Sequence, residues 1–87
     1  RLQIWQFAFP EEAPLSENID MSFLAQQFKI AGGNIKNVAV TAAFLAAQDG
    51  ESIAMEHLIQ ATKREYQKMG KLLVENDFGP YFQLVKG

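Results

Sequence analysis

The residues that could support acid–base, nucleophilic or metal chemistry are few in this chain. His57 is the only histidine, and the absence of cysteine excludes disulfides and thiolate metal sites. No carboxylates stand at ligand spacing around His57 in the sequence, so a metal site is not indicated. Ser16, Ser22 and Ser52 lack a nucleophile-elbow motif, although spacing alone leaves a Ser-His-Asp arrangement open. We therefore expect a structural or helix-capping role for His57 and no catalysis by this chain alone.

The sequence gives little support to binding of nucleotide phosphates or of nucleic acids. No Gly-x-x-x-x-Gly-Lys-Ser/Thr loop is present, so the chain lacks the means to hold nucleotide phosphates as a P-loop protein does. The formal net charge of -2 gives no support to a nucleic-acid or anionic membrane partner. A helix-turn-helix would need base-reading side chains on the segment VAVTAAFLAA, residues 38–47, which offers none. We expect neither a nucleic-acid nor a membrane partner.

Length and composition suit one small domain. The chain has 87 residues, of which 48% are hydrophobic, enough for a modest core of its own. No apolar run approaches the roughly 20 residues of a membrane span, and no signal peptide opens the chain. The lack of cysteine fits a reducing compartment, so we expect a cytoplasmic protein. Because the chain begins with Arg1 and not Met, we interpret it as a fragment of a longer protein.

Apolar spacing and helix-breaking residues predict four helices. These helices are expected over residues 1–9, 21–28, 34–48 and 55–69. Asp20 and Asn34 are the predicted N-caps of the second and third helices. Pro10 ends the first helix, and Gly50 and Gly70 provide the left-handed C-terminal positions of the third and fourth.

The third helix is apolar nearly all round, which is typical of a buried, central helix. The fold class expected is therefore all-α, a small four-helix bundle. The bundle would occupy residues 1–70. The tail, residues 71–87, is apolar but broken by Gly-Pro, and the sequence leaves open whether it is helical or disordered.

The stretch IAGGNIKN, residues 30–37, places two glycines directly before Asn34. A turn followed by a helix cap is the ordinary interpretation of this pattern. Such a turn needs at most one glycine for a left-handed residue. The second glycine raises the hypothesis that a ligand comes close to bare backbone here.

Three passages taken together resemble a known family. They are RLQIWQFAFP, then IDMSFLAQQFKIAGGNIKNVAVTAAFLAA, then IAMEHLIQATKREYQKMG. Their order and spacing resemble the C-terminal helical lid subdomain of AAA+ ATPases, close to the bacterial members of the classical AAA clade. In that family an R-x-x-I segment with a following proline opens the lid. A G-A-D-I or G-G-x-I turn then starts an alanine-rich helix, and an I-x-x-x-H/D helix follows. The resemblance covers about residues 1–70.

The resemblance implies a nucleotide-facing surface. The family's lid closes over the adenine and ribose of ATP, which a preceding P-loop domain holds together with Mg²⁺. Ile4 matches the residue that packs on adenine, and Ala8 matches a position near the ribose and base that is often polar or histidine. Gly32 and Gly33 match the Gly-Ala of the turn whose backbone lies against the nucleotide.

The resemblance also bears on phosphate contacts and partners. Gly33 aligns with the sensor-2 arginine of other AAA+ proteins, as alanine does in the classical clade, and Lys36 lies one turn further on and off register. Family members usually act as hexameric motors on protein substrates, which implies an upstream P-loop domain and a homo-oligomer. Lys63, Arg64 and Tyr66 would contribute to a contact with the neighbouring subunit. The alternative for the basic run Lys63, Arg64, Lys68 and Lys71 is a solvated helix face.

A second class of function remains open from sequence. The chain could be a stand-alone helical protein-interaction module that uses its apolar tail, Leu72–Val85, to bind a partner. The two hypotheses differ in what they expect of Phe78, Tyr81 and Phe82. Packing of these rings on the domain's own core weakens the interaction-module hypothesis, whereas exposure strengthens it.

Overall fold

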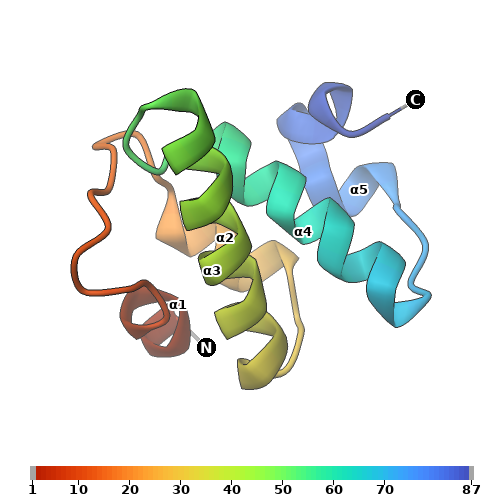
Figure 1. Ribbon diagram of the computed structural model, residues 1–87. Coiled ribbons are helices and arrows are strands. Elements are labelled where there is room, and N and C mark those ends of the chain that lie inside the picture. Colours follow the sequence, from red (N-terminus) through yellow and green to blue (C-terminus); the bar gives the residue numbers. More distant parts are fainter. Residues whose placement is uncertain (1, 87) are drawn as a thin grey trace.

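The elements of the fold are all helices in the part of the chain that the structure, a computed structural model, describes, residues 2–86 (Figure 1). They are α1 (Leu2–Phe7), α2 (Met21–Gln27), α3 (Gly32–Asp49), α4 (Met55–Met69), α5 (Glu75–Phe78) and the 3-10 helix η1 (Gly79–Leu84). The prediction of an all-α bundle is confirmed for these residues. The long loop after α1 is tied to the α3–α4 connection, where Leu15 and Ile53 form an isolated bridge.

Most of the predicted helix ends are confirmed by the local geometry. The Asp20 carboxylate accepts a hydrogen bond from the Phe23 N–H at 3.0 Å, so Asp20 caps α2 as predicted. Gly50 and Gly70 follow α3 and α4 with φ values of 68° and 74°, the left-handed conformation that glycine adopts without strain.

The predicted capping role of Asn34 is wrong. The helix α3 begins at Gly32, with Ala31 as an N-cap residue that supplies no side-chain hydrogen bond. Asn34 is the third helical residue, and its Nδ2 donates to Glu65 Oε2 on α4 at 2.8 Å. The Asn34 side chain therefore hydrogen-bonds to a buried carboxylate on another helix and does not cap its own helix.

The helices α3 and α4 form the main packed pair of the fold. Figure 1 shows α3 crossing α4, with α1 beside the first half of α3 and the tail elements on the far side of α4. α1 packs on both α2 and α3, and η1 packs on α4 and α5. None of the helices in residues 2–86 combines the length and apolar character that crossing a membrane requires.

The expectation that α3 is buried all round is wrong. Its buried side chains are those of Ile35, Val38, Ala39, Ala42 and Ala46. On its outer face Val40 is 50% exposed and Phe44 is 59% exposed. The neighbouring helices cover only one side of α3, and an apolar composition does not by itself provide neighbours for the other side.

The tail packs on the domain and extends its core. Phe78 is fully buried, and its ring centroid lies 5.1 Å from that of Phe28 and 5.7 Å from that of Tyr66. Tyr81 and Phe82 are partly buried against the same core. Such tilted and edge-on aromatic pairs contribute beyond the area they bury. The α5–η1 segment is therefore an ordered part of the fold.

Candidate functional site

Three of the four residues expected to face a nucleotide lie on one surface, where α1 meets the start of α3. Ile4 is 46% exposed on α1, and Gly32 and Gly33 are exposed in the first turn of α3. A Cβ atom built on Gly32 would lie 3.8 Å from Ile4 Cγ2, so these two residues are direct neighbours. The fourth residue, Ala8, is not part of this exposed surface, because it is only 7% exposed and belongs to the core.

Neither glycine is required by the fold of residues 2–86. Both lie in helical backbone, and neither has the positive φ seen at Gly50 and Gly70. No described heavy atom lies within 4 Å of a Cβ built on Gly33, and the contact at Gly32 is an ordinary van der Waals distance. Glycine also costs helix stability relative to alanine. The two residues therefore leave a bare backbone surface for which the chain itself supplies no reason.

The start of α3 offers hydrogen-bond donors at this surface. The first backbone hydrogen bond of the helix runs from the Ile35 N–H to the Ala31 carbonyl at 2.9 Å. The N–H groups of the three residues between them have no acceptor within the helix, and Ala31 provides no capping side chain. Free donors next to the exposed Ile4 side chain form a surface that suits a planar, largely apolar group with acceptor atoms.

A buried carboxylate on α4 fixes the position of this helix start. Glu65 is 4% exposed, and its Oε2 accepts from Asn34 Nδ2 at 2.8 Å and from Asn37 Nδ2 at 3.1 Å. Lys68 Nζ lies 3.3 Å from its Oε1. Burial raises the pKa of Glu65, but the three donors outweigh burial and leave the pKa below its ordinary value of 4.5. Glu65 is therefore ionised at neutral pH.

The Glu65 charge also affects which ligands the site favours. Its carboxylate is hydrogen-bonded to the third residue of α3, so a negative charge lies close to the helix start. That charge opposes the attraction that a helix N-terminus exerts on anions. The surface around Ile4 and Gly32 is thus better suited to an uncharged part of a ligand than to a phosphate.

The basic residues singled out from the sequence lie at the surface, whereas the tyrosine grouped with two of them does not. Lys36 and Arg64 are exposed and Lys63 is partly exposed, in agreement with surface positions. Tyr66, expected with Lys63 and Arg64 on a face toward a neighbouring subunit, is 1% exposed. Its ring packs against Phe28 and the tail, so that part of the expectation is wrong.

His57 has the capping role expected of it. Its Nδ1 accepts from the Ala54 N–H at 2.9 Å at the start of α4. Because Nδ1 accepts this hydrogen bond, the proton of the neutral ring is on Nε2. The Nε2–H group then donates a hydrogen bond to Asp49 Oδ2 at 3.0 Å. His57 therefore links the end of α3 to the start of α4.

A carboxylate pair near His57 was missed in the sequence. Possible ligand atoms of Asp49, Glu51 and His57 lie within 4.8 Å of one another, because the turn at Gly50 brings the two carboxylates toward the ring. Metal binding needs a free lone pair on an imidazole nitrogen. The Ala54 N–H occupies the lone pair of Nδ1, and Nε2 carries the proton. These hydrogen bonds compete with a metal, so we assign the cluster a structural role.

Comparison with known proteins gives no direct guide to function. No protein-family model matches the chain, and no curated protein matches it. A functional proposal therefore depends on the motif order and on the surface around Gly32 and Gly33.

Proposed function

We propose that this chain is the lid subdomain of a cytoplasmic AAA+ ATPase. In this proposal Ile4 packs on the adenine of ATP, and the backbone of Gly32 and Gly33 lies against the base and ribose. An upstream P-loop domain holds the phosphates and Mg²⁺. The chain is not catalytic alone, since the P-loop lysine, the acidic base and the arginine finger belong to that domain and to a neighbouring subunit.

The observation that carries the proposal is the exposed pair of glycines beside Ile4. Neither backbone conformation nor packing within residues 2–86 requires glycine at these positions. A ligand that must approach the backbone without a Cβ in the way supplies the missing reason. The side chain of Ala8 is buried, so in this proposal Ala8 supports α1 beneath the ligand and does not reach it directly.

Exposed apolar side chains support a larger parent protein. Phe7 is 83% exposed, and Val40 and Phe44 are at least half exposed. Large apolar side chains in solvent often mark surfaces that pack against a partner. We propose that the upstream domain and the neighbouring subunit of a homo-oligomer cover such positions, with Lys63 and Arg64 at the subunit contact.

Links between helices support the proposed coupling of nucleotide state to motion. Glu65 joins the first turns of α3 to α4 through two asparagine amides, and His57 joins the other end of α3 to α4. A force applied at the start of α3 would therefore move both helices together. In the proposed motor, the lid transmits nucleotide binding and hydrolysis as a rigid-body movement between subunits.

The interaction-module alternative loses support from the tail. Its expectation was that Phe78, Tyr81 and Phe82 are exposed, whereas Phe78 is fully buried and the other two rings pack on the core. The large apolar side chains left exposed in the tail are Leu72 and, in part, Val74 and Leu84. They offer a much smaller surface for a partner.

The proposal is tested by the gene region that precedes the codon for Arg1. A lid follows a P-loop domain of roughly 200 residues, a common domain size. We expect a Gly-x-x-x-x-Gly-Lys-Ser/Thr motif within that stretch. A gene whose product truly starts at Arg1, or an upstream region without such a loop, would show that the proposal is wrong.

A further inference from the structure

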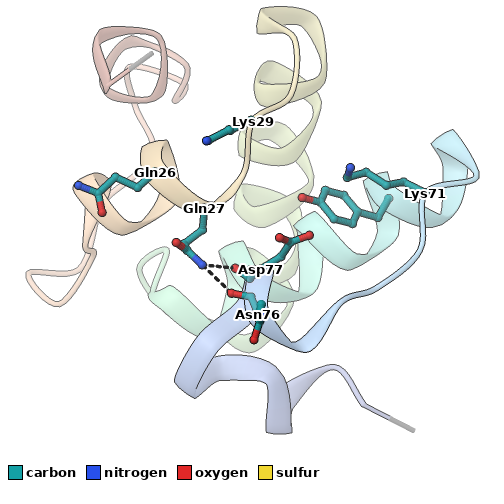
Figure 2. Close-up of a pocket in the computed structure, with 7 residues that line it drawn as sticks. Gln26, Gln27, Lys29, Lys71, Asn76 and Asp77 are labelled. Carbon is teal, nitrogen blue, oxygen red and sulfur yellow. Dashed lines mark hydrogen bonds between the residues drawn. The ribbon is translucent and has the colours of Figure 1, made fainter.

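A polar pocket of about 380 Å³, lined by none of the residues of the proposed nucleotide surface, lies between the end of α2, the end of α4 and α5. Figure 2 shows Gln27 meeting Asn76 and Asp77 with Lys71 on the other side, while the side chains of Gln26 and Lys29 point outward. Besides Tyr66, the residues that line the pocket are Gln26, Gln27, Lys29, Lys71, Asn76 and Asp77. The pocket exists only because the tail folds back on the domain.

Gln27 holds one wall of the pocket in place. Its Nε2 donates to the backbone carbonyl oxygens of Asn76 at 2.7 Å and Asp77 at 3.0 Å, the dashed bonds of Figure 2. These bonds use both amide hydrogens and attach α5 to α2. The Gln27 Oε1 atom remains as an acceptor at the pocket.

Tyr66 presents a hydroxyl without an internal partner. The residue is 1% exposed, and its ring is fixed by Phe28 and Phe78. No described residue hydrogen-bonds to the hydroxyl, although the residue lines the pocket. Burial, and then the charge of Asp77, raise the pKa of Tyr66 to about 12. The hydroxyl therefore stays protonated and can donate. Because Tyr66 lines the pocket, its hydroxyl is available to a ligand bound there.

The pocket carries a local excess of positive charge. Lys29 and Lys71 lie on two sides of it in Figure 2, above Asn76 and Asp77. Neither lysine forms an ion pair with a carboxylate of residues 2–86. Lys71 Nζ lies 5.3 Å from the centre of the Tyr66 ring, so a cation and a phenol act together on one side. Two lysines against one aspartate favour a ligand with a single negative charge.

We propose that this pocket binds a carboxylate that has a neighbouring amide N–H, the chemistry of a peptide's C-terminal residue and of a free N-acylated amino acid. The carboxylate pairs with Lys71 and accepts a hydrogen bond from the Tyr66 hydroxyl. The ligand N–H donates to Asp77 or to Gln27 Oε1. Inorganic phosphate fits less well, because it has no N–H for these acceptors and places more negative charge beside Asp77.

The test is a nuclear magnetic resonance titration of the whole chain, Arg1–Gly87, with three probes. The probes are N-acetyl-trialanine with a free C-terminus, the same peptide with an amidated C-terminus, and inorganic phosphate. We expect saturable shifts of backbone amides in residues 26–29, 66–71 and 76–77 with the free carboxylate, and much weaker shifts with the other two. Equal shifts with the amidated peptide, or with phosphate, would overturn the proposal.

A fourth titration with N-acetylalanine separates the two sources of this chemistry. Binding as tight as that of the peptide assigns the site to a free N-acylated amino acid, and clearly weaker binding assigns it to a peptide terminus. Both results support the shared chemistry, whereas no binding of either carboxylate contradicts it.

Variants identify the groups responsible. Lys71→Met should weaken binding of the carboxylate peptide about tenfold, as loss of one charge-assisted hydrogen bond predicts. Tyr66→Phe keeps the buried ring and should weaken binding several-fold without loss of fold. Lys86→Met removes an exposed lysine outside the pocket and serves as the matched control. If Lys86→Met weakens binding as much as Lys71→Met does, general charge explains the effect and the proposal is wrong.

Discussion

Replacing Gly33 with alanine should make the isolated chain more stable, and replacing Gly32 should make the parent ATPase less able to bind ATP. Gly33 is the second residue of α3, its φ is not positive, and a Cβ there meets no described heavy atom within 4 Å. Alanine is favoured over glycine in a helix by about 0.5–1 kcal/mol. For a domain of this size the gain corresponds to a rise in melting temperature of about 2–8 °C.

The assay is thermal unfolding followed by the fluorescence of Trp5, the only tryptophan and a fully buried one. The matched control is Gly50→Ala, which forces a side chain into a left-handed residue with φ of 68°. That substitution should destabilise the chain by about 1–2 kcal/mol. If Gly33→Ala also destabilises the chain, the fold needs this glycine and the reason for inferring a ligand disappears.

The second half of the prediction uses the full-length ATPase that we propose. A side chain at Gly32, where the resembled family also has glycine, would overlap the bound nucleoside, and forced overlap costs about 1–3 kcal/mol. The KM for ATP should therefore rise about 5- to 150-fold, more for Gly32→Val than for Gly32→Ala, whereas Gly33→Ala should leave it little changed because the family's turn carries alanine there. An unchanged KM for both Gly32 variants would refute nucleotide contact at this residue.

Three further predictions concern stability, measured by urea unfolding. Because the pKa of Glu65 is lowered in the folded chain, its contribution to the free energy of unfolding is present above pH 4.5 and is lost as the pH falls through the lower folded value. Glu65→Gln should therefore make stability less sensitive to acid. An unchanged dependence of stability on pH would contradict this prediction. His57→Ala should cost about 1 kcal/mol at the start of α4, and Zn²⁺ should not stabilise the wild type, because Ala54 occupies Nδ1. Phe78→Ala should cost about 3–5 kcal/mol, whereas a loss below about 1 kcal/mol would mean that the tail is not part of the core.

Local sequence was enough for features that depend on neighbouring residues. Asp20 as a cap and Gly50 and Gly70 as helix ends follow from backbone chemistry within a few positions, and all three are found as predicted. The exposed pair Gly32 and Gly33 was likewise singled out from sequence, although for a turn conformation that neither adopts.

Features that depend on distant residues were missed. The side chain of Asn34 goes to Glu65 and not to a helix cap, a choice that requires knowing where α4 lies. The burial of Tyr66 and Phe78 depends on the tail folding back, which the Gly-Pro break left undecided. The pocket lined by Lys71 draws on three separate segments and has no sequence motif.

Photolabelling tests the central claim most directly. The full-length protein would be irradiated with an ATP analogue that carries an azido group on the adenine, with and without excess ATP. The account predicts an ATP-protected label on peptides that contain Ile4 or Gly32 and Gly33. A specifically labelled protein with no label on these peptides would contradict the proposal that this chain closes over the adenine.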